Sequence, residues 1–105
     1  MNATEAFSAP GHPYNCAQAV AIGAGREDLL PELAACGGGR APAGHCGALH
    51  AALRIAPSEK HDAILAQFQA EAGALTCREI KGTTHFPCVK CVELASRLLS
   101  EAQSG

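Results

Sequence analysis

The sequence predicts an all-α fold, a compact bundle of about four to five short helices. Apolar residues recur at helical spacing in several segments, and no segment alternates apolar and polar residues as a half-buried strand does. Capping residues and glycine or proline breakers separate these segments. The chain of 105 residues fits one domain with a modest core.

The first half of the chain contains three predicted helices. One covers residues 16–24, with Asn15 as its N-cap. A short second helix covers roughly residues 29–35 and ends before the glycines at 37–39, which are poor helix formers. A third covers about residues 45–55.

The second half begins with an amphipathic helix over residues 58–73, which we expect Gly73 to end. Residues 76–79 match a capping box and put Cys77 in the first position of a short helix. Residues 82–85 are expected to be a loop. Proline suits a first helical turn, so the last helix is expected over residues 87–101.

We therefore divide the chain into three parts. Residues 1–13 are expected to be a flexible leader, because two prolines and a glycine interrupt any helix there. Residues 14–101 form a single helical cysteine-cluster domain, and residues 102–105 a frayed tail. The leader lacks the features of a secretory signal, and no segment approaches the length of a membrane span, so a cytoplasmic location is expected.

Composition narrows the classes of function. The net charge is −2 and the basic residues are scattered, which argues against nucleic acid as a partner. The chain has no Trp and only 4% aromatic residues, so its core buries little area per residue and would gain from a metal or disulfide staple. Since no paired-carboxylate motif or Ser-His-Asp set is present, a redox or metal-binding module is expected before a stand-alone enzyme.

Six cysteines are the strongest chemical signal in the chain. A lone cysteine is often just a small buried apolar side chain, but ordinary composition rarely supplies six in so short a protein. In a reducing compartment such a count indicates metal binding or redox chemistry more than a disulfide framework. The six are Cys16, Cys36, Cys46, Cys77, Cys88 and Cys91.

Four of these cysteines stand at predicted helix starts and are the candidate metal ligands. They are Cys16, Cys46, Cys77 and Cys88. The positive end of a helix dipole favours the thiolate, which is both the metal ligand and the nucleophile. If the four helix starts converge, they form a pocket of thiolates in which backbone N–H groups could also reach the sulfurs of a cluster.

Other residues are auxiliary or alternative ligands. Cys91 completes a Cys-x-x-Cys motif with Cys88, and Cys36 follows the end of a helix. His85 extends that motif to a His-x-x-Cys-x-x-Cys spacing, a possible zinc set, although loop histidines are more often simply solvated. His50 falls on the same helical face as Cys46, where a core hydrogen bond is the commoner role.

Four glycines are candidates for close approach of the backbone to a helix or a cofactor, because glycine has no Cβ. They are Gly37, Gly38, Gly39 and Gly47. The glycine run lacks the Gly-Lys-Ser/Thr ending and the preceding strand of a phosphate-binding loop, so we do not interpret it as one.

With these residues in place, the chain resembles the C-GCAxxG-C-C family of redox-active cysteine proteins. The matching pieces are residues 14–20, 37–39, 44–49 and 77–82, then Cys88 with Val92 and Ala95, in the order of the family. By this resemblance the four helix-start cysteines are the family's characteristic ones, and a similar module in split-Soret cytochromes implies an iron–sulfur centre. Ala51 stands where the motif ends in glycine, and Cys36 and Cys91 are additional to the four.

Three functions remain open. The first is an iron–sulfur-binding or electron-transfer module, the second a metal-free thiol–disulfide redox protein or sensor, and the third a Zn or Cu(I) thiolate protein. We favour the first, because dispersed thiolates at helix starts suit a closed centre better than exchange, which needs an accessible attacking thiol and a resolving partner. We expect a redox partner protein, leave self-association into a homo-oligomer open, and expect neither nucleic acid nor a membrane as partners.

Overall fold

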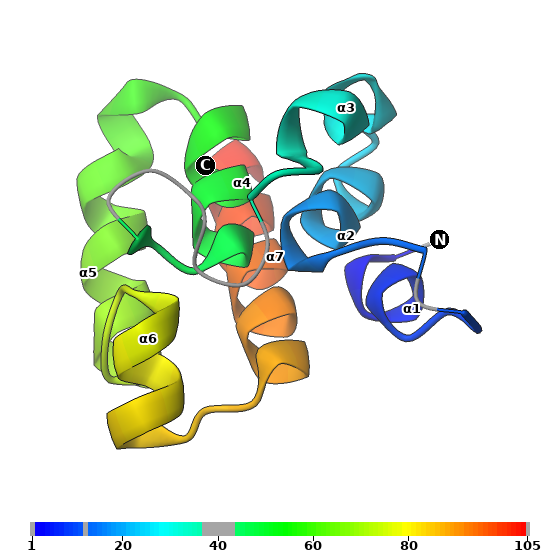
Figure 1. Cartoon of the computed structure of the whole chain (residues 1–105). Coiled ribbons are helices and arrows are strands. Elements are labelled where there is room, and N and C mark those ends of the chain that lie inside the picture. The colour runs from blue at the N-terminus through cyan, green and yellow to red at the C-terminus, as the bar shows by residue number, and fades with distance from the viewer. Residues whose placement is uncertain (1, 12, 37–43, 105) are drawn as a thin grey trace.

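The computed structural model describes residues 2–11, 13–36 and 44–104, and these residues form an all-α protein (Figure 1). The predicted fold class is confirmed. The described residues contain seven α-helices, more than the four to five expected, because three of the seven are only three to five residues long. The one strand-like feature in these residues is an isolated antiparallel bridge between His45 and Thr76.

The helices follow one another with short connections. Their bounds are α1 Ala3–Phe7, α2 Cys16–Gly23, α3 Leu30–Leu33, α4 Gly47–Ile55, α5 His61–Ala72, α6 Cys77–Glu79 and α7 Cys88–Ser104. Two 3₁₀ turns, Glu27–Leu29 and Ser58–Lys60, precede α3 and α5, and a π-helical turn, Ile80–Thr84, follows α6. The predicted last helix thus continues beyond residue 101.

Helix α7 is the central element of the bundle. Helices α2 and α4 pack against each other and against α7, while α5 covers another side of α7 (Figure 1). Phe68 of α5 and Val92 and Leu99 of α7 are among the most deeply buried side chains. In Figure 1, α5 and α6 lie on one side of α4 and α7, and α1, α2 and α3 lie on the other.

Residues 3–7 form helix α1, so the prediction that the segment 1–13 contains no helix is wrong there. Asn2 and Glu5 make a capping box, in which Asn2 Oδ1 accepts from Glu5 N–H at 2.8 Å. Ala3 is buried against Gly23 of α2, where an added Cβ would come within 2.6 Å of the Ala3 nitrogen. The prolines and the glycine that interrupt helices follow α1 in the sequence. Because Ala3 and Gly23 are small, α1 can pack closely on α2.

Several helix boundaries agree with the sequence signals. Asn15 caps α2 in a capping box with Gln18, and the Thr76 hydroxyl accepts from Glu79 N–H to cap α6. Gly73 ends α5 in the left-handed conformation, with φ of 89°. Each of these caps satisfies backbone groups that a helix end leaves without a partner.

Two other boundaries also differ from the prediction. Helix α4 begins at Gly47 rather than near His45, with Cys46 as its N-cap, and the N–H of Cys46 bonds to the carbonyl of Leu75. The segment expected to be a loop over 82–85 is mostly the π-helical turn, which ends at His85 with φ of 55°.

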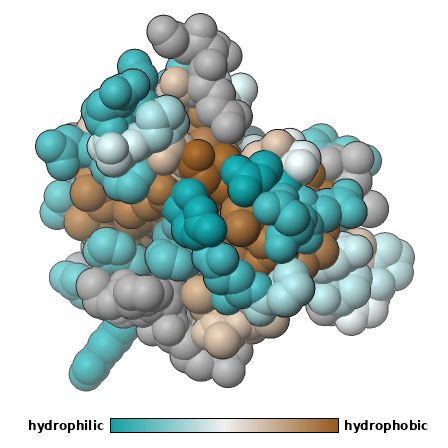
Figure 2. All heavy atoms as spheres, turned by 90° about the horizontal axis from the view of Figure 1, so that it is seen from above, coloured by the Kyte–Doolittle hydropathy of each residue, from teal (hydrophilic) through white to brown (hydrophobic). Residues whose placement is uncertain are grey.

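None of the helices within the described ranges is long and apolar enough to cross a membrane. The face seen in Figure 2 carries hydrophilic side chains with apolar ones visible between them. Such mixing is ordinary for a small domain, because polar groups cannot cover its whole surface.

Candidate functional site

Five cysteines line one small cavity between the helices. Its walls are Cys16, Cys46, Cys77, Cys88 and Cys91, with Ile80 and Phe86. The cavity measures about 30 Å³. The four cysteines predicted to converge therefore do so, and Cys91 joins them.

Cys16 is the first residue of α2, and its position is fixed by the cap before it. Asn15 Oδ1 accepts from Gln18 N–H, while Asn15 Nδ2 donates to the carbonyls of Leu33 and Ala34 at 3.0 and 3.1 Å. One amide side chain thus begins α2 and ties that helix start to the end of α3. As a result Cys16 is held half-buried at the cavity.

Cys46 and Cys77 come together through the bridge between His45 and Thr76. The N–H of Cys46 donates to the Leu75 carbonyl at 2.9 Å, so the residue before α4 lies beside the residues before α6. Thr76 then caps α6 and places Cys77 in its first position. The start of α4 and the start of α6 therefore reach the same cavity.

Cys88 and Cys91 lie one turn apart at the start of α7, where the N–H of Cys91 donates to the Pro87 carbonyl at 3.0 Å. Cys91 is only 3% exposed, whereas Cys88 is half-buried. The Cys-x-x-Cys motif thus contributes one partly accessible thiol and one buried thiol to the same wall.

Gly47 allows the backbone to approach this site closely, as predicted. A Cβ at this position would stand 2.6 Å from the Cys36 carbonyl oxygen and 2.7 Å from the Cys16 sulfur. Any larger residue would push one of them away. Gly37, Gly38 and Gly39, predicted to have the same role, lie outside the described residues.

The thiols are linked to one another by hydrogen bonds. The Cys46 thiol is hydrogen-bonded to the thiols of both Cys16 and Cys91. Backbone N–H groups also reach the sulfurs, from Ala48 to Cys16 and from Leu49 to Cys46. The start of α4 therefore directs its N–H groups at two of the five sulfurs.

Backbone N–H groups at the helix starts lower the pKa of Cys16 and of Cys46, as expected, but other contacts outweigh this effect and raise both pKa values. The hydrogen bond to Cys46, and then burial, raise the pKa of Cys16 above its ordinary value. For Cys46, the hydrogen bond with Cys16 lowers the pKa, but the bond to Cys91 and burial outweigh it and raise the pKa to about 12. Both residues are thiols at neutral pH, because helix N–H groups do not compensate for burial beside other sulfurs.

Three of the auxiliary residues do not line the cavity. Cys36 is 9% exposed, and its thiol lies 4.0 Å from the Glu32 carbonyl oxygen, while its own carbonyl faces Gly47. His50 is half-buried on α4, where burial lowers its pKa. His85 is exposed at the left-handed turn before α7.

Sequence reasoning missed Ile80 and Phe86, the two apolar walls of the cavity. No pattern identified them, because their role depends on how the π-helical turn and the segment after it fold over the thiols. Both side chains make part of the cavity wall apolar, while Cys16, Cys77 and Cys88 stay partly exposed.

The donor set is chemically uniform, since the five polar residues at the cavity all carry sulfur. Thiolate sulfur selects soft metals and iron–sulfur clusters over hard cations. Within the described ranges, no three Cys, His, Asp or Glu side chains are arranged to hold one metal ion. Comparison with known protein families, curated proteins and solved structures finds no match to this chain.

Proposed function

We propose that this chain is a small redox-active protein whose clustered cysteines hold an iron–sulfur cluster and that it transfers electrons to a partner protein in the cytoplasm. The observation that supports this proposal is the convergence of five thiols from four helix starts on one apolar cavity. The proposed ligands are Cys16, Cys46, Cys77 and Cys88, with Cys91 as an additional thiol beside them.

The donor chemistry of the cavity supports this proposal. Iron–sulfur clusters are held by cysteine thiolates, and hydrogen bonds to sulfur and exclusion of solvent set their reduction potential. Here the N–H groups of Ala48 and Leu49 reach two of the sulfurs, while Ile80 and Phe86 cover the site. When bound, the cluster supplies a one-electron redox couple.

The chain itself has three tasks in this proposal. The caps at Asn15 and Thr76 hold two ligands at fixed helix starts, and Gly47 leaves room for the Cys16 sulfur. The thiols of Cys16 and Cys46 must lose their protons to become ligands, so loading releases protons to solvent. The apolar walls keep water from the sulfurs afterwards.

Anaerobic purification followed by visible absorption spectroscopy and iron, sulfide, zinc and copper analysis tests the proposal. We expect a coloured protein with stoichiometric iron and sulfide, whose visible absorption bleaches on reduction. A colourless protein with stoichiometric zinc or copper would instead establish the Zn or Cu(I) thiolate alternative. A colourless protein that binds none of these metals would leave thiol–disulfide chemistry.

A metal-free thiol–disulfide function is the second candidate, favoured by the hydrogen-bonded thiols of Cys16, Cys46 and Cys91. One thiolate would attack an external disulfide and release one thiol, and a neighbouring thiolate would then displace the second. The protein loses two hydrogens and gains one S–S bond, while the external disulfide is reduced to two thiols. Titration of the metal-free protein with oxidised glutathione, followed by disulfide mapping, detects this reaction.

A further inference from the structure

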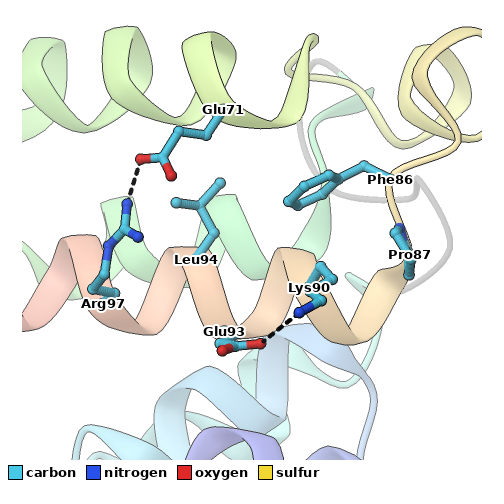
Figure 3. A pocket seen from close by; sticks show the side chains of 7 residues that line it. All are labelled: Glu71, Phe86, Pro87, Lys90, Glu93, Leu94 and Arg97. Carbon is cyan, nitrogen blue, oxygen red and sulfur yellow. Dashed lines mark hydrogen bonds and ion pairs between the residues drawn. The ribbon is translucent and has the colours of Figure 1, made fainter.

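A surface groove runs beside the thiol cavity, between α5 and α7 (Figure 3). It measures about 430 Å³, far more than the cavity, and it opens to solvent. Among the residues that line it are Glu71, Phe86, Lys90, Glu93, Leu94 and Arg97.

Phe86 belongs to both spaces. Its side chain lines the groove on one side and the cysteine cavity on the other. In Figure 3 its ring extends from the segment before α7 into the space between α5 and α7, on the same side as Leu94. The other apolar wall of the cavity, Ile80, is 2% exposed and does not line the groove.

The first turns of α7 form the rest of the partition. Lys90, Glu93 and Leu94 line the groove, whereas Cys88 and Cys91 line the cavity. Cys91 therefore lies directly behind the groove wall, although it is almost completely buried. Phe86 is the one residue common to the walls of these two spaces.

The charges at the groove do not select for one sign of ligand. Glu71 pairs with Arg97, and Lys90 pairs with Glu93 at 3.8 Å (Figure 3). Two acidic and two basic side chains balance each other, and the apolar surfaces of Phe86 and Leu94 lie between them. Such a passage suits small uncharged molecules better than ions.

We propose that this groove is the entrance to the thiol cavity and that Phe86 is its gate, admitting small uncharged thiols and disulfides to Cys91. This proposal rests on the proposed function, because Phe86 controls access to the same cysteine cavity. The local structure permits ring movement, because Phe86 is partly exposed, lies outside the helices and follows the left-handed turn at His85.

The test measures how fast 4,4′-dithiodipyridine, a small uncharged disulfide, labels Cys91 in the reduced, metal-free protein. Labelling forms a mixed disulfide at Cys91 and releases one thiopyridone, and peptide mass spectrometry identifies the cysteine. Phe86→Ala should accelerate this labelling by about tenfold, which corresponds to roughly 1.4 kcal/mol of barrier. Phe86→Leu, which keeps part of the apolar plug, should give a rate between those of Phe86→Ala and the wild type.

Leu98→Ala is the matched control, because Leu98 is buried on α7 but lines neither the groove nor the cavity. Its Cys91 should be labelled at the wild-type rate, once the rates are corrected for global unfolding measured in urea. Unchanged labelling in both Phe86 variants, or an equal acceleration in Leu98→Ala, would overturn the gate. Since no metal is present in this assay, its result is independent of the iron analysis that tests the proposed function.

Discussion

The contact of α1 with α2 and the cysteine cavity each depend on a glycine that brings two segments close together, but the two sites differ in what surrounds that glycine. Where α1 meets α2, Ala3 packs onto Gly23 so closely that an added Cβ would stand 2.6 Å from the Ala3 nitrogen. At the other site, Gly47 brings backbone and sulfur together just as closely, yet a cavity remains beyond them. The first contact only stabilises the fold. The second also places five thiols around a cavity, where they are not needed for packing alone.

Removal of single thiols should have the largest effect and separates the two kinds of cysteine. Ser substitution at Cys16, Cys46, Cys77 or Cys88 should abolish the metal centre, because a four-thiolate site then loses a quarter of its ligands. Iron and sulfide per chain, measured after anaerobic purification, check this expectation.

Cys91→Ser and Cys36→Ser are the matched variants. Cys91 should tune the reduction potential or stability of the centre without emptying it, and Cys36 lies outside the cavity wall, so both variants should keep their iron. If Cys91→Ser empties the site while Cys16→Ser or Cys77→Ser remains loaded, the proposed ligand assignment is wrong.

Alanine substitutions at the tightly packed Gly23 and Gly47 test whether close packing has the same role at the α1–α2 contact and at the cysteine cavity. An added methyl group at Gly47 or Gly23 would stand 2.6 Å from a backbone atom, so each alanine substitution should cost about 1–3 kcal/mol of unfolding free energy. Urea denaturation of the metal-free variants measures this loss.

Only one of these variants should also change the metal content. Gly47→Ala displaces the Cys16 sulfur and should lower the iron per chain, whereas Gly23→Ala displaces α1 and should leave it unchanged. An equal loss of iron in both would show that general stability, and not the geometry at Cys16, controls loading.

Alkaline pH should destabilise the metal-free protein through the cavity thiols. The native pKa of Cys46 is raised from 9.0 to about 12, so its contribution is fully present below pH 9 and is lost as the pH rises towards 12. The loss is at most about 1.4 kcal/mol per pH unit for each such group. Urea denaturation between pH 8 and 11 measures it, and Cys46→Ser should show a shallower decline than the wild type.

The smallest effect is expected from the helix caps, where Asn15 and Asn2 form equivalent capping boxes. Asn15→Ala should cost about 1 kcal/mol of stability and lower metal affinity, because the cap holds Cys16 at the cavity. Asn2→Ala should fray α1 without changing metal affinity. Competition with a chelator measures the metal affinity of both variants. Equal affinities would show that Asn15 does not position Cys16 for metal binding.

Local signals in the sequence predicted most helix boundaries, since a cap such as Asn15 or a left-handed glycine such as Gly73 acts within a few residues. Helix α1 was missed although Asn2 and Glu5 give a local capping-box signal, and its contact with Gly23 does not show in local propensity. Four cavity cysteines were predicted from their positions at helix starts.

The remaining features of the site depend on tertiary contacts. The sequence analysis gave Cys91, which lines the cavity, the same auxiliary role as Cys36, which does not, although the Cys-x-x-Cys spacing linked Cys91 to Cys88. The raised pKa values of Cys16 and Cys46 arise from their mutual contact and burial, and these outweigh the helix-start effect that the sequence suggested.

The bridge between His45 and Thr76 also has a consequence for the order of folding. It joins positions 31 residues apart, whereas the helices on either side depend on local contacts. Helices form within about a microsecond, but pairing of distant segments must first overcome the entropy of loop closure. We therefore expect the thiols to come together late, so that a newly synthesised chain exposes separate, reactive cysteines before it has a cavity to protect them.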